Sequence, residues 1–116
     1  NNLRINGKVG YEQGPDLTLD GGAITVTHSY HRVMTEVSGD PDNVEVINGA
    51  SASDIGQILI LQKVPGLTNP AITVLDAGDI NLQGGSKLLD NDKDTLMLIW
   101  HGSKWIQLSH SNNQGS

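Results

Sequence analysis

The sequence predicts an all-β domain, and three features lead to this prediction. Short runs rich in Val, Ile and Thr recur between clusters of Gly, Asn and Asp. No stretch of useful length repeats apolar residues with the 3.6-residue period of a helix. The length of 116 residues suits a single domain. We therefore expect a compact antiparallel β-sandwich or barrel-like module of short strands.

The residues available for a hydrophobic core are few. The chain contains no Phe and no Cys, and only 3% of its residues are aromatic. Ile, Leu and Val must therefore fill the interior together with the two Trp and two Tyr. A thin core in a chain with 14 Gly is often reinforced by association of several copies. The absence of Cys excludes disulfides, thiolate metal sites and Cys nucleophiles.

Net charge and hydropathy narrow the choice of partners. The formal net charge is -6 and the seven Lys and Arg are scattered, so no basic patch is available for a nucleic-acid backbone. No apolar run approaches the roughly 20 residues that a membrane helix needs. We expect neither a nucleic-acid nor a membrane partner.

Residues 1–16 are predicted to form an extended N-terminal arm, followed by an all-β domain over 17–113 and a flexible tail over 114–116. The apolar residues of the arm are spaced by two, four and two, so all can lie on one face of an extended segment. They are Leu3, Ile5, Val9 and Tyr11. We expect this stripe to bind a partner chain by strand addition. A disordered terminus is the alternative.

Alternation of apolar residues and turn signals place the strands of the domain. The expected strands cover residues 23–37, 44–47, 57–63, 71–76, 79–83 and 87–89. Ile and Leu follow one another without alternation in 57–63, which predicts a central strand covered on both faces. The segments 71–76 and 79–83 are expected to pair around Ala77-Gly78.

A hairpin is expected at the C-terminal end of the domain. Residues 95–100 and 104–108 flank Gly102-Ser103, and Gly at the first central position fits a type II′ turn. This register sets Trp100 opposite Trp105, where the two indoles would pack in the core. Stacking on a sugar, with His101 beside them, is the alternative.

The histidines are candidates for a metal site or an interface. In one continuous strand, His28 and His31 would point to opposite faces and could not share an ion. His28 would then lie on the apolar face with Ile24, Val26 and Tyr30. We interpret it as a core or subunit-interface histidine.

The acidic segment Asp90–Asp94 has oxygen ligands at alternate positions, like the start of a calcium loop. An EF-hand needs Gly at the sixth position and Glu at the twelfth, and this chain has Thr95 and His101 there. The segment is predicted to be a solvated turn, and we expect no metal and no cofactor. Neither a G-x-S-x-G elbow nor a phosphate-binding loop occurs, so no catalytic residue is predicted and the protein is expected not to be an enzyme.

Four segments in one order resemble structural proteins of tailed-bacteriophage virions. Residues 19–33 read LDGGAITVTHSYHRV, and residues 56–62 read GQILILQ. Residues 73–82 read TVLDAGDINL, and residues 89–109 read LDNDKDTLMLIWHGSKWIQLS. The resemblance covers residues 17–113. It departs from the family pattern at Trp100-His101 and at Ser109-His110-Ser111, which affects any ligand inferred from the family more than the fold.

The resemblance implies a homotrimeric virion component without catalytic residues. Because only a short arm precedes the domain, we expect a capsid decoration or cement protein on the head surface that binds the major capsid protein or other virion proteins. The alternative is the head or receptor-binding domain of a tail fibre or tailspike that recognises a host-surface glycan.

Overall fold

A computed structural model of the chain describes residues 6–66 and 70–113, and within them the fold is all-β. Eleven short strands and one 3-10 turn at Ala52–Asp54 follow one another in these residues. The strands are β1 (Leu17–Thr18), β2 (Ala23–Thr25), β3 (Tyr30–Met34), β4 (Asp42–Val44), β5 (Val46–Asn48), β6 (Ile58–Lys63), β7 (Ile72–Val74), β8 (Ile80–Asn81), β9 (Lys87–Leu89), β10 (Thr95–Trp100) and β11 (Trp105–Ser111).

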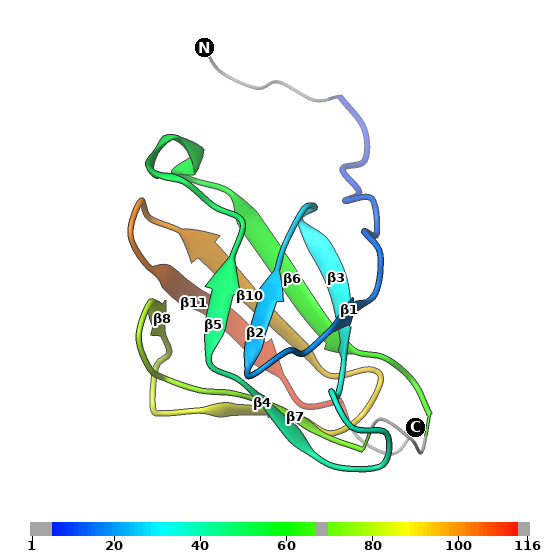
Figure 1. Cartoon of the computed structure of the whole chain (residues 1–116). Coiled ribbons are helices and arrows are strands. Elements are labelled where there is room, and N and C mark those ends of the chain that lie inside the picture. Colours follow the sequence, from blue (N-terminus) through cyan, green and yellow to red (C-terminus); the bar gives the residue numbers. More distant parts are fainter. Residues whose placement is uncertain (1–5, 67–69, 114–116) are drawn as a thin grey trace.

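The strands form three sheets. The largest has six strands in the order β1-β3-β6-β10-β11-β8, and the smaller ones are β2-β5 and β4-β7-β9. In Figure 1, β2 and β5 lie in front of β6 and β10, while β4 and β7 run across the lower end of the large sheet. The small sheets therefore cover one face of the large sheet, which we call the inner face.

The inner face and the two small sheets enclose one hydrophobic core. Alternate residues of β6 and β10 point into it, and Trp105 of β11 is fully buried there. The core members are Leu19, Ile24, Val26, Val33, Val44, Ile47, Leu59, Leu61, Ile72, Val74, Ile80, Leu82, Leu89, Leu96, Leu98, Trp100 and Trp105. Aliphatic side chains and two indoles thus fill the interior, as the composition predicts.

Strand pairing differs from the antiparallel arrangement predicted from sequence. Five of the eight pairings between the strands above are parallel. The chain passes from one sheet to another after most strands, so neighbours in sequence seldom pair. Partners instead come from distant segments that run in the same direction, as β3 and β6 do.

Three strand predictions are wrong for the same reason. The expected strand 23–37 is interrupted at residues 26–29, and its halves, β2 and β3, belong to different sheets. The expected strand 44–47 is divided between β4 and β5. Segments 71–76 and 79–83 do not pair, because a turn in which the Ile80 N–H donates to the Ala77 carbonyl directs the chain to another sheet.

The prediction of the C-terminal hairpin is confirmed. β10 and β11 pair antiparallel with Trp100 opposite Trp105, and Gly102 has a φ of +110° in the turn. The register shifts between Met97 and Leu98, which indicates a β-bulge. The central position of β6 is also confirmed, since it lies between β3 and β10. Only its inner face is fully covered, however, because its outward residues are half-buried.

Candidate functional site

His31 fastens the base of the N-terminal arm to the domain. Its side chain is fully buried, and its Nδ1 donates to the Pro15 carbonyl at 2.9 Å. Its Nε2 accepts the backbone N–H groups of Thr27 and His28 at 2.9 and 3.0 Å. The imidazole of this β3 residue therefore connects two other segments by hydrogen bonds. They are the arm and the turn that precedes β3. A carbonyl oxygen can only accept, so this arrangement requires the tautomer with the proton on Nδ1.

Gly14 allows the arm to approach this histidine. A Cβ added there would lie 2.5 Å from Cε1 of His31 and 2.8 Å from Nδ1 of His28. The Gly14 N–H also donates to the Tyr30 carbonyl at 2.7 Å. The arm is thus attached to the domain from about residue 13 onward, before the pairing of β1 with β3.

The interpretation of His28 as the histidine of the apolar face is wrong. The break at residues 26–29 shifts the alternation, so His31 is buried while His28 is only half-buried. The two rings do not point to opposite faces, because their centroids are 5.7 Å apart in an edge-to-face arrangement. Thr27 Oγ1 forms a hydrogen bond with Nδ1 of His28 at 2.8 Å.

The structure places Trp100 and Trp105 in the core. Their ring centroids are 5.1 Å apart, and the exposed fractions of the two residues are 7% and 0%. The Trp100 Nε1 donates to the Ser51 carbonyl at 2.8 Å. Neither indole offers a ring face to a sugar in this structure, so the ligand alternative is not supported for them. His101 is exposed at the tip of the hairpin.

The described part of the arm is exposed throughout residues 6–12. Val9 and Tyr11 have exposed fractions of 60% and 45%, which are large for apolar side chains. Leu3 and Ile5, the other two members of the predicted stripe, lie outside the described residues. Residues 6–12 lead away from β1 in Figure 1.

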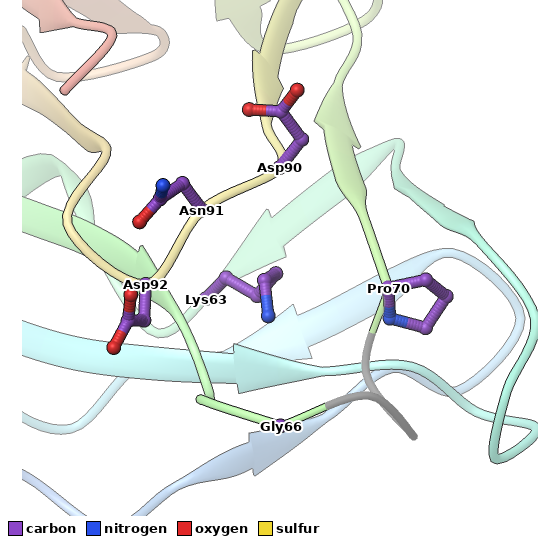
Figure 2. A pocket seen from close by; sticks show the side chains of 6 residues that line it. All are labelled: Lys63, Gly66, Pro70, Asp90, Asn91 and Asp92. Atoms are coloured by element: carbon purple, nitrogen blue, oxygen red, sulfur yellow. The ribbon is translucent and has the colours of Figure 1, made fainter. Parts of the chain in front are cut away.

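A cleft of about 480 Å³ lies beside the acidic loop. Its lining residues are Lys63, Gly66, Pro70, Asp90, Asn91 and Asp92 (Figure 2). The exposed fraction of Lys63 is only 4%, and its Nζ donates to the Val64 carbonyl at 3.1 Å. Two carboxylates and one ammonium group therefore face the cleft. Among residues 6–66 and 70–113, no group of three or more His, Cys, Asp or Glu could hold a metal ion.

Asp94 shows that the acidic loop is not a solvated turn throughout, as the sequence had indicated. Its side chain is fully buried, and its Oδ1 accepts the Asn113 N–H at 2.6 Å while Oδ2 accepts the Asp90 N–H at 3.2 Å. Desolvation by burial acts to raise the pKa of Asp94. Hydrogen bonds from the backbone of Asn113, Asp90 and Asn91 outweigh it and hold the pKa below its ordinary value. The carboxylate thus fastens the end of β11 to the turn before β10.

We expect Asp94→Asn to lower the free energy of unfolding by about 1–3 kcal/mol at pH 7, because an amide replaces the charged acceptor. A lowered pKa in the folded state means that the carboxylate stabilises fully above its ordinary pKa of 3.8. That contribution is lost as the pH falls through the lowered value. Urea unfolding at pH 7, 5 and 3 should show the difference between wild type and variant shrinking only below about pH 4.

The exposed neighbour Asp92 provides the control, since Asp92→Asn should change stability by less than about 0.5 kcal/mol. A wild-type stability for Asp94→Asn at pH 7 would contradict the fastening role of the carboxylate.

Sequence reasoning missed a surface on the large sheet. The face opposite the core, which we call the outer face, carries five half-buried apolar side chains on three adjacent strands. They are Ile58, Ile60, Met97, Ile99 and Ile106, and we call them the outer patch. The lack of alternation in β6 was the available signal, but it was interpreted only as a central strand covered on both faces.

Comparisons with known proteins identify no relative of this chain. No family model matches this chain, and no curated protein and no solved structure is significantly similar to it. Among the described residues, no helix is long and apolar enough to cross a membrane.

Proposed function

We propose that this chain is a non-enzymatic structural protein of a bacteriophage virion, and more narrowly a trimeric capsid decoration or cement protein that stabilises the head. The observation that carries this proposal is the N-terminal arm. His31 and Gly14 hold its base, whereas Val9 and Tyr11 project into solvent beyond it. An apolar segment with a fixed base and exposed side chains beyond it is suited to binding a neighbouring protein.

The resemblance of residues 17–113 to virion structural proteins supports the same proposal. The strong acidity of the chain also fits a partner other than nucleic acid. The protein would stabilise the head by adding contact area. A trimer whose arms reach adjacent capsid subunits connects those subunits to one another. Burying a Val or Tyr side chain of the arm against a capsid subunit contributes roughly 1.5–3 kcal/mol.

Deleting residues 1–12 should leave a folded domain that binds undecorated capsids at least tenfold more weakly. The deletion ends before Gly14, because Gly14 and Pro15 bond to the domain. Binding is measured by co-sedimentation with capsids that lack this protein. The finer variant Val9→Ser with Tyr11→Ser should reproduce most of the loss, while Val37→Ser, at an exposed apolar residue elsewhere, should not.

Full capsid affinity of the truncated chain would refute the role of the arm. If the intact chain binds no capsid but binds host cells or an arrayed host-surface glycan, the receptor-binding domain of a tail fibre or tailspike replaces decoration as the function. Exposed loop residues such as His101 would then be the first positions to test.

A further inference from the structure

The outer face of the six-stranded sheet is apolar where a solvated sheet face would be polar. In a sheet with one solvent-exposed face, inward apolar residues usually alternate with outward polar residues along each strand. Here β6 and β10 carry apolar residues on both faces at their centres. Register places Ile60 beside Met97, and Ile58 beside Ile99, which in turn lies beside Ile106. These five side chains, the outer patch, are therefore contiguous across three strands.

The outer patch is not covered by the other two sheets. Those sheets pack on the inner face, and all five side chains remain half-buried rather than buried. Tyr30 continues the row on β3 beside Ile60, and its hydroxyl donates to Gln62. A contiguous apolar surface rimmed by polar groups is typical of a protein interaction site.

The distribution of charge favours a second copy as the occupant. The chain carries 13 Asp and Glu, yet none lies in the four strands that form this part of the sheet, β3, β6, β10 and β11. Two copies of a chain with a net charge of -6 repel each other wherever their acidic loops approach. The Asp16 carboxylate, which reaches this face beside β3, is paired with the outward Arg32 at 3.3 Å. The outer face is therefore a surface where two copies can approach without opposing unpaired carboxylates from these strands.

The outer face is also large enough to contribute to a specific protein interface. Strands are about 4.8 Å apart and residues on one face repeat about every 6.8 Å, so each outward residue covers roughly 33 Å² in projection. Four strands with about three outward residues each then present roughly 400 Å², and protruding side chains increase the accessible area. Three copies that each bury such a face remove roughly 1,200 Å² from solvent in total, which is the lower end of the range for specific interfaces.

We propose that the outer patch is the surface through which copies of this chain associate. This inference deepens the proposed function and rests on it for the number of copies, three. It predicts that the outer faces of the three copies meet around a common axis, while the arms remain available for another protein. The edges of the large sheet, β1 and β8, are only two residues long and offer little to strand addition.

The first test compares molar masses by light scattering and sedimentation. Wild type should have the mass of an oligomer at micromolar concentration, and Ile99→Asp should have the mass of a monomer because it places a carboxylate at the centre of the patch. Leu88→Asp is the matched control: Leu88 is an exposed residue of β9 in another sheet, and its variant should remain oligomeric. Circular dichroism of the packed Trp pair shows whether each variant is folded.

A second measurement serves if Ile99→Asp fails to fold. Because the chain has no Cys, Ile60→Cys and Leu88→Cys each introduce a single thiol. Alkylation of Cys at position 60 should be at least tenfold slower at high protein concentration than after dilution below the dissociation constant of the oligomer. Alkylation at position 88 should not depend on protein concentration.

The possible results separate this inference from the proposed function. A wild-type monomer at micromolar concentration overturns both the interface and the trimer. An oligomer that persists in Ile99→Asp, with alkylation at position 60 independent of concentration, overturns the interface and leaves a trimer built through another surface. Protection of position 60 that persists in dilute monomer, and disappears when residues 1–12 are deleted, overturns the inference by showing that the chain's own arm covers the patch.

Discussion

Replacing Trp105 with Ala should lower the free energy of unfolding by about 3–5 kcal/mol. Trp105 is fully buried and lies opposite Trp100, with a centroid separation of 5.1 Å. Its strand also pairs with β8, and its backbone N–H donates to the Asp79 carbonyl at 2.7 Å. In a chain without Phe, few side chains can fill the resulting cavity. Urea unfolding followed by circular dichroism measures the loss.

Trp105→Phe is the matched comparison for this variant. The Nε1 of Trp105 is buried and has no hydrogen-bond partner among the described residues, so Phe removes volume without breaking a hydrogen bond to that atom. The Phe variant should therefore lose clearly less stability than the Ala variant. His101→Ala, at the exposed tip of the same hairpin, should change stability by less than about 0.5 kcal/mol.

All of these variants must be compared at one protein concentration, because association of copies would stabilise the folded state by mass action. An unchanged unfolding midpoint for Trp105→Ala would show that the ring does not support the core. Sugar stacking by this residue would then regain support.

Local signals in the sequence were sufficient to predict the C-terminal hairpin and the central strand. The hairpin of β10 and β11 could be predicted because Gly102 favours the turn and the turn sets the register that brings Trp100 opposite Trp105. The strand β6 could be predicted because its run of Ile and Leu suits a central strand. In both cases the information lies within about ten residues of the chain.

Pairing between distant segments could not be predicted in the same way. Strands such as β2 and β5 have three residues each, which is too short for a side-chain pattern to specify a partner. Their parallel pairing depends on the paths of the intervening loops. The error at His28 has a related cause, because a break of a few residues reversed which histidine faces the core.

The outer patch shows why an apolar pattern alone does not identify the layer that covers it. Residues on both faces of β6 are apolar, and the sequence was interpreted as a central strand covered on both faces. The structure covers the inner face, with Leu59 and Leu61, but leaves Ile58 and Ile60 half-buried. The predicted cover is therefore present on the inner face, and none of the described residues supplies it on the outer face. That the second layer comes from another copy remains a proposal.

His31→Leu should lower the free energy of unfolding by about 3–5 kcal/mol, although the two side chains have similar volumes. The change removes the acceptor of the Thr27 and His28 N–H groups and the donor to the Pro15 carbonyl. A fully buried backbone group that loses its partner costs about 1–3 kcal/mol. The three groups here are part-buried, so water recovers a part of that cost. Stability is again measured by urea unfolding.

His28→Leu is the control for His31→Leu, because the His28 side chain is half-buried and forms its hydrogen bond with the exposed side chain of Thr27. It should lose less than about 1 kcal/mol. Hydrogen exchange gives a second readout: in His31→Leu the amides of Thr27 and His28 should exchange at least tenfold faster, while those of the distant β10 change only with global stability. Wild-type protection at these two amides would refute the anchoring of the arm by His31, since His31 is the acceptor that the structure assigns to both.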